Sequence, residues 1–323
     1  MTAAPDSARD SWIAERLHLA GHELSRLEQI HVGPSGYVLA ADTTGGARFY
    51  FKGCNAVSAH EPEVSAALAA RFPGAVPDVP GCDPAQGWLL LSDAGPTVKA
   101  LTQADGDITR WDAMLRAFAA LQQAAVLHVE SLLAAGVPDR RPDRLPTLYA
   151  GLLADAGALL LDHPDGVSEA DLARLQAYTP AVRELCARIA SYNIPSTLEH
   201  DDFHVGNVGL RDGQYCFFDW GEAFIAHPFY SLMLALRYAK FVFHTADAAL
   251  DHLREVYLGC WLDYEPIERL RELAALTDQL AALSRALTWR DAATLASNEF
   301  RADMLDAAPY WLLTFLNNTP LDY

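Results

Sequence analysis

Short apolar runs of strand length alternate with glycine-containing turns near the N-terminus. The runs are Leu27–Val32, Tyr37–Ala41 and Arg48–Lys52, and residues 33–36 and 43–46 separate them. Apolar and aromatic runs bounded by such turns are typical of β-strands joined as hairpins. This part of the chain is therefore predicted to form a three-stranded antiparallel meander.

From residue 93 onward the apolar residues recur mainly at helical spacing. Ser168-Glu169-Ala170-Asp171 resembles a capping box and opens a helix that Thr179-Pro180 should interrupt. An earlier helix is expected to begin near Glu61. The other predicted helices cover 111–135, 229–243, 246–262, 266–287 and 292–315. A small sheet followed by many helices predicts an α+β fold.

One strand pair is expected inside this helical region. Val208–Arg211 and Gln214–Phe218 flank Asp212-Gly213, a strong two-residue hairpin signal. A two-residue turn fixes the register and pairs 211 with 214, 210 with 215, 209 with 216 and 208 with 217. Residues 207 and 218 should then be neighbours, which brings Asn207 beside Asp219 if the strand ends at Asp219.

The most informative motif surrounds this hairpin. His200-Asp201-Asp202-Phe203-His204-Val205-Gly206-Asn207 precedes it, and Asp219 ends it. The pattern His-x-Asp-x-x-x-x-Asn followed by a second Asp is typical of phosphoryl-transfer sites. Asp202 is then the candidate base and His200 a partner that orients the loop. Asn207 and Asp219 supply the oxygen ligands that Mg²⁺ prefers. The alternative is an ordinary polar loop with a strand-ending Asp.

Candidate nucleotide-binding residues lie upstream. The first turn of the meander, which contains Ser35 and Gly36, could cover phosphates, and Lys52 ends the third strand where a kinase places its phosphate-binding Lys. That Lys needs an acidic partner on the next helix. Glu61 and Glu63 both qualify, and Glu61 shares a helix face with apolar residues. The sequence leaves this choice open, since both could simply complement the helix dipole.

These residues resemble the aminoglycoside phosphotransferase-like (choline-kinase-like) family over most of residues 25–240. Members typically carry His-Gly-Asp-Leu-His-x-Gly-Asn and then an apolar strand that ends in Asp-Trp, as Asp219-Trp220 does here. Asp201 replaces the usual Gly. Ala226-His227-Pro228 with Ser231 stands where many members have Gly-Asp-Pro and a further Asp. The departures bear on the acceptor, because they adjoin the candidate base and the metal-binding strand.

The resemblance implies a two-lobed protein-kinase-like fold, with a nucleotide-binding lobe over residues 1–91 and a mainly helical catalytic and acceptor-binding lobe over 92–323. Leu89–Asp93 would be the hinge, with Leu91 and Asp93 near adenine. It implies transfer of the γ-phosphate of ATP or GTP, with Mg²⁺, to a hydroxyl of a small molecule. Candidate acceptor contacts are Glu222, Asp263, Glu299 and Asp303, although acidic residues at such positions are more often simply solvated.

Two other functions remain open on the sequence. One is a metabolic kinase for an amino alcohol or a sugar. The other is a non-catalytic nucleotide-binding regulator, although the presence of Lys52, Asp202, Asn207 and Asp219 together argues against it. A protein kinase is disfavoured because no Ala-Pro-Glu motif or long activation segment follows Asp219.

The composition of the chain limits the classes of molecule that it is expected to bind. Lys and Arg number 24 against 42 Asp and Glu, which gives a formal charge of −18. This argues against nucleic acid, whose phosphates are bound by clustered cations, and favours a cationic acceptor electrostatically. The five cysteines lack metal-ligand spacing, and the N-terminus lacks a basic start with an apolar core. We therefore expect a cytoplasmic monomer or homodimer that does not bind membranes.

Overall fold

The computed structural model describes residues 7–161 and 163–321, and these form two compact units. The first unit runs to Gly106 and also includes Val205–Gly221. The second holds Asp107–His204 and the chain from Glu222 onward. The hairpin predicted in the helical region therefore belongs to the first unit. The functional boundary predicted after residue 91 stays a prediction.

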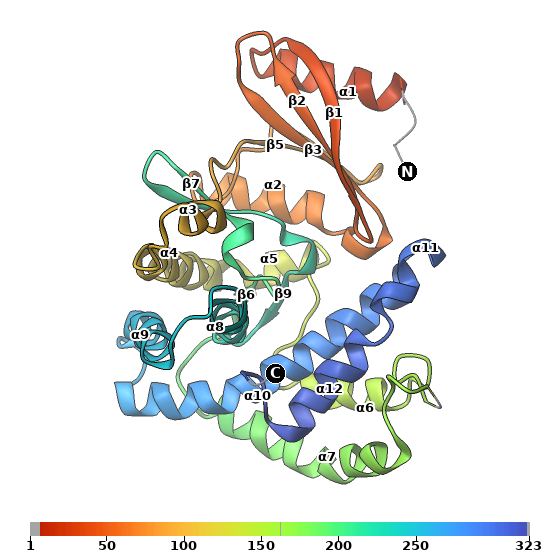
Figure 1. Ribbon diagram of the computed structural model, residues 1–323, viewed down its shortest axis with the longest axis vertical. Coiled ribbons are helices and arrows are strands. Elements are labelled where there is room, and N and C mark those ends of the chain that lie inside the picture. Colours follow the sequence, from red (N-terminus) through yellow and green to blue (C-terminus); the bar gives the residue numbers. More distant parts are fainter. Residues whose placement is uncertain (1–6, 162, 322–323) are drawn as a thin grey trace. The chain divides into compact units, whose positions relative to one another are not determined.

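An antiparallel five-stranded sheet dominates the first unit, in the order β1-β2-β3-β5-β4 (Figure 1). The strands are β1 Leu24–Gly33, β2 Gly36–Thr43, β3 Arg48–Cys54, β4 Gly81–Asp83 and β5 Trp88–Ser92. The predicted meander is its first three strands. Helix α1, Ser7–Leu19, was not predicted, and its Ile13 and Leu17 join Phe49, Phe51 and Leu90 in one buried cluster. Burial of this helix face anchors it to the sheet.

The remaining elements of the first unit are short. They are η1 Ala56–Ser58, α2 Glu61–Arg71, α3 Val98–Asp105, η3 Val205–Asn207, β7 Val208–Arg211 and β8 Gln214–Phe217. The four predicted pairs of the β7–β8 hairpin are confirmed, from Val208 with Phe217 to Arg211 with Gln214. The strand was predicted to end at Asp219, but β8 ends at Phe217. Asp219 instead has φ 69°, a left-handed conformation that cannot continue a strand.

Gly36 begins β2 with φ 134°, and a Cβ built there would lie 2.0 Å from the carbonyl oxygen of Gly53. We expect Gly36→Ala to lower the free energy of unfolding by about 2 kcal/mol or more, because backbone strain and a backbone clash add. Gly45→Ala is the matched control, since a Cβ there meets nothing within 4 Å. Urea denaturation measures both, and equal stabilities for the two variants would contradict the expectation.

Helices make up most of the second unit (Figure 1). They are α4 Arg110–Ala125, η2 Val126–His128, α5 Val129–Ala134, α6 Leu145–Leu153, α7 Glu169–Ala190, α8 Tyr230–Val242, α9 Asp247–Leu258, η5 Gly259–Trp261, α10 Ile267–Leu295, α11 Asn298–Arg301, η6 Ala302–Met304 and α12 Ala307–Asn317. Strands β6 Thr197–Glu199 and β9 Phe224–Ala226 pair in a two-stranded antiparallel ladder. Along the chain, β6 comes before the segment Val205–Gly221 of the first unit and β9 comes after it. The 3₁₀ turn η4 Trp220–Glu222 leads into β9.

Several predicted helix limits were wrong. Pro180 was expected to interrupt its helix but lies inside α7. A proline in a helix interior costs about 3 kcal/mol, and residues buried on both sides of it, Leu175 and Val182, offset that cost. The helix predicted to end at residue 287 continues to Leu295, and the helix predicted over 111–135 is broken by a 3₁₀ turn at Val126–His128.

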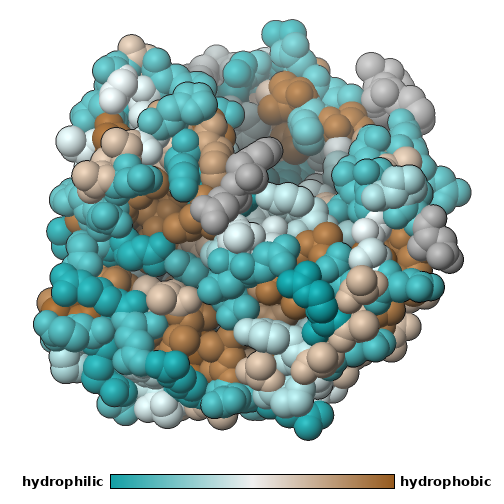
Figure 2. Space-filling model, turned by 60° about the horizontal axis from the view of Figure 1, so that its bottom comes forward, coloured by the Kyte–Doolittle hydropathy of each residue, from teal (hydrophilic) through white to brown (hydrophobic). Residues whose placement is uncertain are grey.

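Figure 2 shows one face on which polar side chains predominate and apolar ones lie in small groups between them. Among the described residues, one helical stretch, Arg110–Ala134, is apolar and long enough to cross a membrane by length and composition alone. A core helix of a soluble protein passes the same test, so this is weak evidence for a span.

Candidate active site

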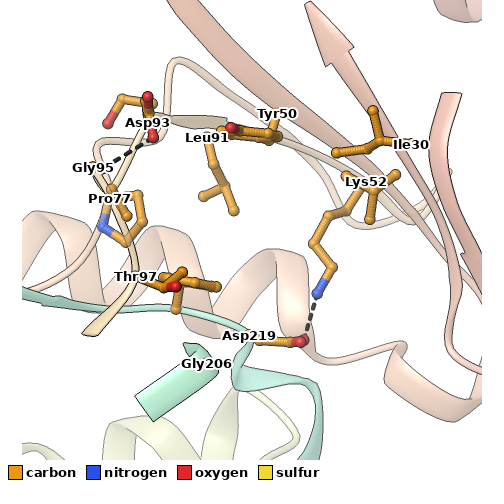
Figure 3. A pocket seen from close by; sticks show the side chains of 14 residues that line it. Ile30, Tyr50, Lys52, Pro77, Leu91, Asp93, Gly95, Thr97, Gly206 and Asp219 are labelled. Atoms are coloured by element: carbon orange, nitrogen blue, oxygen red, sulfur yellow. Dashed lines mark hydrogen bonds and ion pairs between the residues drawn. The ribbon is translucent and has the colours of Figure 1, made fainter. Parts of the chain in front are cut away.

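Three charged side chains meet in the first unit. Lys52 Nζ lies 2.5 Å from Glu61 Oε1 and 2.7 Å from Asp219 Oδ1 (Figure 3 shows the contact with Asp219). Lys52 comes from β3, Glu61 from the first turn of α2, and Asp219 from the chain after β8. Glu61 is fully buried whereas Glu63 is exposed. The structure thus pairs Lys52 with Glu61 and not with Glu63.

This cluster keeps its lysine charged. Burial alone would lower the pKa of Lys52, but the charges of Asp219 and Glu61 raise it above its usual range. Burial raises the pKa of Glu61, and the charge of Lys52 opposes that rise. The Cys54 thiol donates to the second Glu61 oxygen at 3.7 Å. Lys52 is therefore held extended as a cation, the state in which it can bind phosphate.

A cavity of about 320 Å³ opens beside Lys52 and Asp219 (Figure 3). Its walls are Ile30, Val38, Tyr50, Lys52, Pro77, Leu91, Ser92, Asp93, Ala94, Gly95, Thr97, Gly206, Phe218 and Asp219. Leu91 and Asp93, expected near adenine, line it. Apolar walls with a few convergent polar groups are typical of small-molecule sites.

The turn predicted to cover phosphates lies between Ile30 and Val38, which both line the cavity, and its role stays a prediction. Ser35 and Gly36 do not line the cavity. The Ser58 hydroxyl donates to the carbonyl oxygen of Ser35 at 2.7 Å, and the Asn55 side-chain amide donates to that of Pro34 at 2.7 Å. These bonds fasten the β1–β2 turn to the loop and 3₁₀ turn after β3, and the sequence pattern carried no signal for them.

The hairpin brings the two candidate metal ligands close along the backbone. Phe218 N donates to Asn207 O at 3.1 Å, one residue before Asp219. Among the described residues, no group of three or more His, Cys, Asp or Glu could form a metal site of its own. A carboxylate and an amide oxygen do fit Mg²⁺ bound together with nucleotide phosphates, which supply the remaining ligands.

The motif loop of the second unit is tightly folded. Asp202 N donates to His200 O at 2.8 Å, and Asp201 between them has φ 60°. Glycine adopts such a backbone at little cost, which explains why the usual residue at this position is Gly. His204 Nε2 lies 3.4 Å from Asp202 Oδ2. Phe203 stacks on Phe118 with ring centroids 3.9 Å apart, and this contact anchors the loop in the core.

The environment of Asp202 favours the carboxylate. Burial would raise its pKa, but the hydrogen bond from His204 and the positive charge of Arg285 bring it below its usual range. Asp202 is therefore ionised at neutral pH. Its side chain is 32% exposed, so an incoming hydroxyl can reach it.

The four predicted acceptor contacts do not form one cluster. Glu222 Oε2 accepts from Arg285 Nη1 at 2.6 Å. Asp263 is exposed and precedes α10, so about 27 Å of helix separates it from Arg285 at the helical rise per residue. Glu299 and Asp303 are exposed beyond the other end of α10. Asp263 therefore cannot share a small acceptor with either of them.

Glu222 should make stability depend on pH. Burial raises its pKa to about 7, against the attraction of Arg285 and with the repulsion of Asp202 and Asp201. The folded state thus binds this proton more tightly than the unfolded state, so the stabilisation is full below about pH 4.5 and is lost as the pH rises through about 7. Glu222→Gln should flatten the fall of Tm across that window. Asp263→Asn is the control, and an unchanged slope in Glu222→Gln would contradict the assignment.

Sequence reasoning missed several residues around Asp202. His204 was within the motif but received no role. Arg285 and Thr288 of α10 and Arg140 contact the loop or its partners, from positions far away in the sequence. The available signal was Arg285 itself, a lone cation within the apolar stretch 280–287. A buried charge needs a partner, and the partner here is Asp201.

The comparisons with known proteins agree with this arrangement. Solved structures of several phosphotransferases and kinases share the fold. A macrolide 2′-phosphotransferase type I has 20% identity and a TM-score of 0.57, and the match covers 96% of this chain and 99% of that one. Choline kinase from Cryptosporidium parvum Iowa II has 12% identity and a TM-score of 0.59, and the match covers 91% of this chain and 87% of that one. The GDP complex of aminoglycoside 2′-phosphotransferase-IIIa has 16% identity and a TM-score of 0.58, and the match covers 97% of this chain and 99% of that one.

At these identities the likeness shows the fold, and the predicted two-part kinase-like architecture is confirmed. Among curated proteins, none matches the sequence. Residues 26–273, more than half of the chain, match the phosphotransferase enzyme family. The resemblance seen in the motif is therefore confirmed, and the chain belongs to the phosphotransferase enzyme family.

Proposed function

We propose that this protein transfers the γ-phosphate of ATP or GTP to a hydroxyl group of a small molecule. The observation that carries the proposal is the Lys52–Glu61–Asp219 cluster at the edge of the 320 Å³ cavity. A fixed lysine and a carboxylate beside an apolar cavity are what a nucleoside triphosphate requires of a protein. Membership of a phosphotransferase family supports the same reaction.

Each residue has a distinct task in this reaction. Lys52 binds the α- and β-phosphates, and Glu61 keeps it extended. Asn207 and Asp219 would hold Mg²⁺, which neutralises phosphate charge when bound. Asp202, already ionised, orients the acceptor hydroxyl and takes its proton as the new P–O bond forms and the bond from the γ-phosphorus to the departing ADP or GDP breaks. His204, 3.4 Å away, fixes the carboxylate.

The acceptor that the charges favour is cationic. The chain carries a formal charge of −18, and Glu222 offers a carboxylate in the unit that holds Asp202. An aminoglycoside meets this requirement, and an amino alcohol meets it too. The structural likeness to both an aminoglycoside phosphotransferase and a choline kinase supports keeping both classes.

The test is Mg²⁺-dependent release of ADP or GDP with a panel of aminoglycosides, macrolides, amino alcohols and sugars. Stimulation by one acceptor class, abolished in Asp202→Ala, would support the proposal and identify the class. If no acceptor stimulates release although thermal shift shows nucleotide binding, the non-catalytic regulator becomes the better interpretation. Absence of nucleotide binding would refute the role of the cavity.

A further inference from the structure

A buried polar cluster in the second unit ties α10 to the loop that carries Asp202. The Asp201 carboxylate accepts from the Thr288 hydroxyl at 2.5 Å and from Arg285 Nη1 at 3.1 Å. The same Arg285 nitrogen lies 3.3 Å from the carbonyl oxygen of Asp201. Asp201 is only 5% exposed. Side chain and backbone of the residue before Asp202 are thus both held by one helix.

The hydroxyl of Thr288 is itself held in place by Arg140. Arg140 Nη1 donates to it at 2.5 Å and to the carbonyl oxygen of Ser284 at 2.9 Å. The Arg140 guanidinium lies 4.5 Å from the centroid of the Phe224 ring. Because Arg140 can only donate, the single hydroxyl hydrogen of Thr288 goes to Asp201, 2.5 Å away, or to the carbonyl oxygen of Ser284, 3.4 Å away, and the contact with Asp201 is the shorter one. The bond to Asp201 therefore runs from the Thr288 hydroxyl to the carboxylate.

The backbone conformation of Asp201 determines the orientation of Asp202. Its φ of 60° is a left-handed conformation that residues with a Cβ adopt rarely. Asp202 N donates to His200 O across it, so the turn at Asp201 sets the direction in which Asp202 leaves the loop. Contacts that stabilise this conformation of Asp201 also aim the carboxylate of Asp202.

Arg285 connects the loop to a second carboxylate. The nitrogen that contacts Asp201 also donates to Glu222 Oε2 at 2.6 Å. That nitrogen carries two hydrogens for three acceptor oxygens, two on Asp201 and one on Glu222. The side chain of Arg285 is 6% exposed, so water contributes little to this competition. A change at Glu222 must therefore alter the hydrogen bonds between Arg285 and Asp201.

We propose that Thr288 and Arg285 of α10 are positioning residues for phosphoryl transfer, which hold Asp201 in its left-handed conformation and thereby aim Asp202. The inference rests on the proposed function. Arg285 also connects Glu222 to this cluster. When a cationic group of the acceptor binds Glu222, Arg285 can donate fully to Asp201. Acceptor binding and alignment of Asp202 are then linked through one guanidinium group.

The test uses Thr288→Val, which keeps the shape and removes the hydroxyl, and Asp201→Gly, which removes the carboxylate but suits the backbone. Each should lower kcat about tenfold, since small misplacements of reacting groups cost one to two orders of magnitude. The nucleotide KM should stay within about twofold. The double variant should be no slower than Asp201→Gly alone, because both changes remove the same hydrogen bond.

Thr294→Val is the matched control, since that hydroxyl donates to the carbonyl oxygen of Arg290 in its own helix. Thermal melting of every variant separates misfolding from misalignment, and Arg285→Lys should keep more activity than Arg285→Met. Wild-type kcat in both single variants, or additive losses in the double variant, would overturn the inference alone. If the unmodified protein neither hydrolyses nucleotide nor phosphorylates any acceptor, the proposed function and this inference fall together.

Discussion

Replacing Asp202 by alanine should lower kcat by about a thousandfold, within the range expected for loss of a positioned base. The ionised carboxylate of Asp202 is the group proposed to orient the hydroxyl, and the neighbouring Arg285, which is always protonated, cannot accept a proton in its place. Nucleotide affinity should be unchanged, because Asp202 does not line the cavity. Initial rates of ADP or GDP release and calorimetric titration with nucleotide measure the two quantities.

Asp212→Asn is the matched control for this substitution. Asp212 occupies the β7–β8 turn with φ 52°, a conformation that asparagine tolerates, and it is exposed. The control should turn over at the wild-type rate. If Asp202→Ala retains more than about a tenth of wild-type kcat, Asp202 is not the base.

Replacing Asp219 by asparagine should reduce kcat/KM by about a hundredfold to a thousandfold. A metal ion contributes several kcal/mol to phosphoryl transfer, and each 1.4 kcal/mol is worth about tenfold. Asparagine keeps the shape and tolerates the left-handed backbone of residue 219, but it lacks the charge that holds a divalent cation. Lys52 keeps its contact with Glu61, so the fold should survive.

The measurement is turnover as a function of Mg²⁺ concentration. The half-saturating concentration should rise in Asp219→Asn and stay at the wild-type value in Glu63→Gln, which removes an exposed carboxylate of the same unit. An unchanged Mg²⁺ dependence in Asp219→Asn would show that this residue does not bind the metal.

Local signals predicted the parts of the structure that local geometry determines. The register of the β7–β8 hairpin follows from the two residues of its turn, and the four pairs from Val208–Phe217 to Arg211–Gln214 were correct. The meander and the partner helix of Lys52 likewise came from short patterns. The end of β8 was missed because the left-handed conformation of Asp219 leaves no trace in the hydrophobic pattern.

Contacts between distant segments were beyond reach of such patterns. Lys52 and Asp219 are 167 residues apart, and Arg285 and Asp201 are 84 apart. The motif suggested that the first two belong to one site, but nothing in the sequence pointed from α10 to the loop. The predicted helix ended at residue 287, just before Thr288, and the buried partners of Thr288 could not be known from the sequence.

The composition of the cavity wall has a practical consequence for inhibitors. All fourteen lining residues belong to the first unit, and the candidate acceptor residues from Glu222 onward belong to the second. A nucleotide-competitive compound would therefore act equally on variants that have exchanged one acceptor for another. Escape from such a compound would have to arise among residues of the proposed nucleotide site itself.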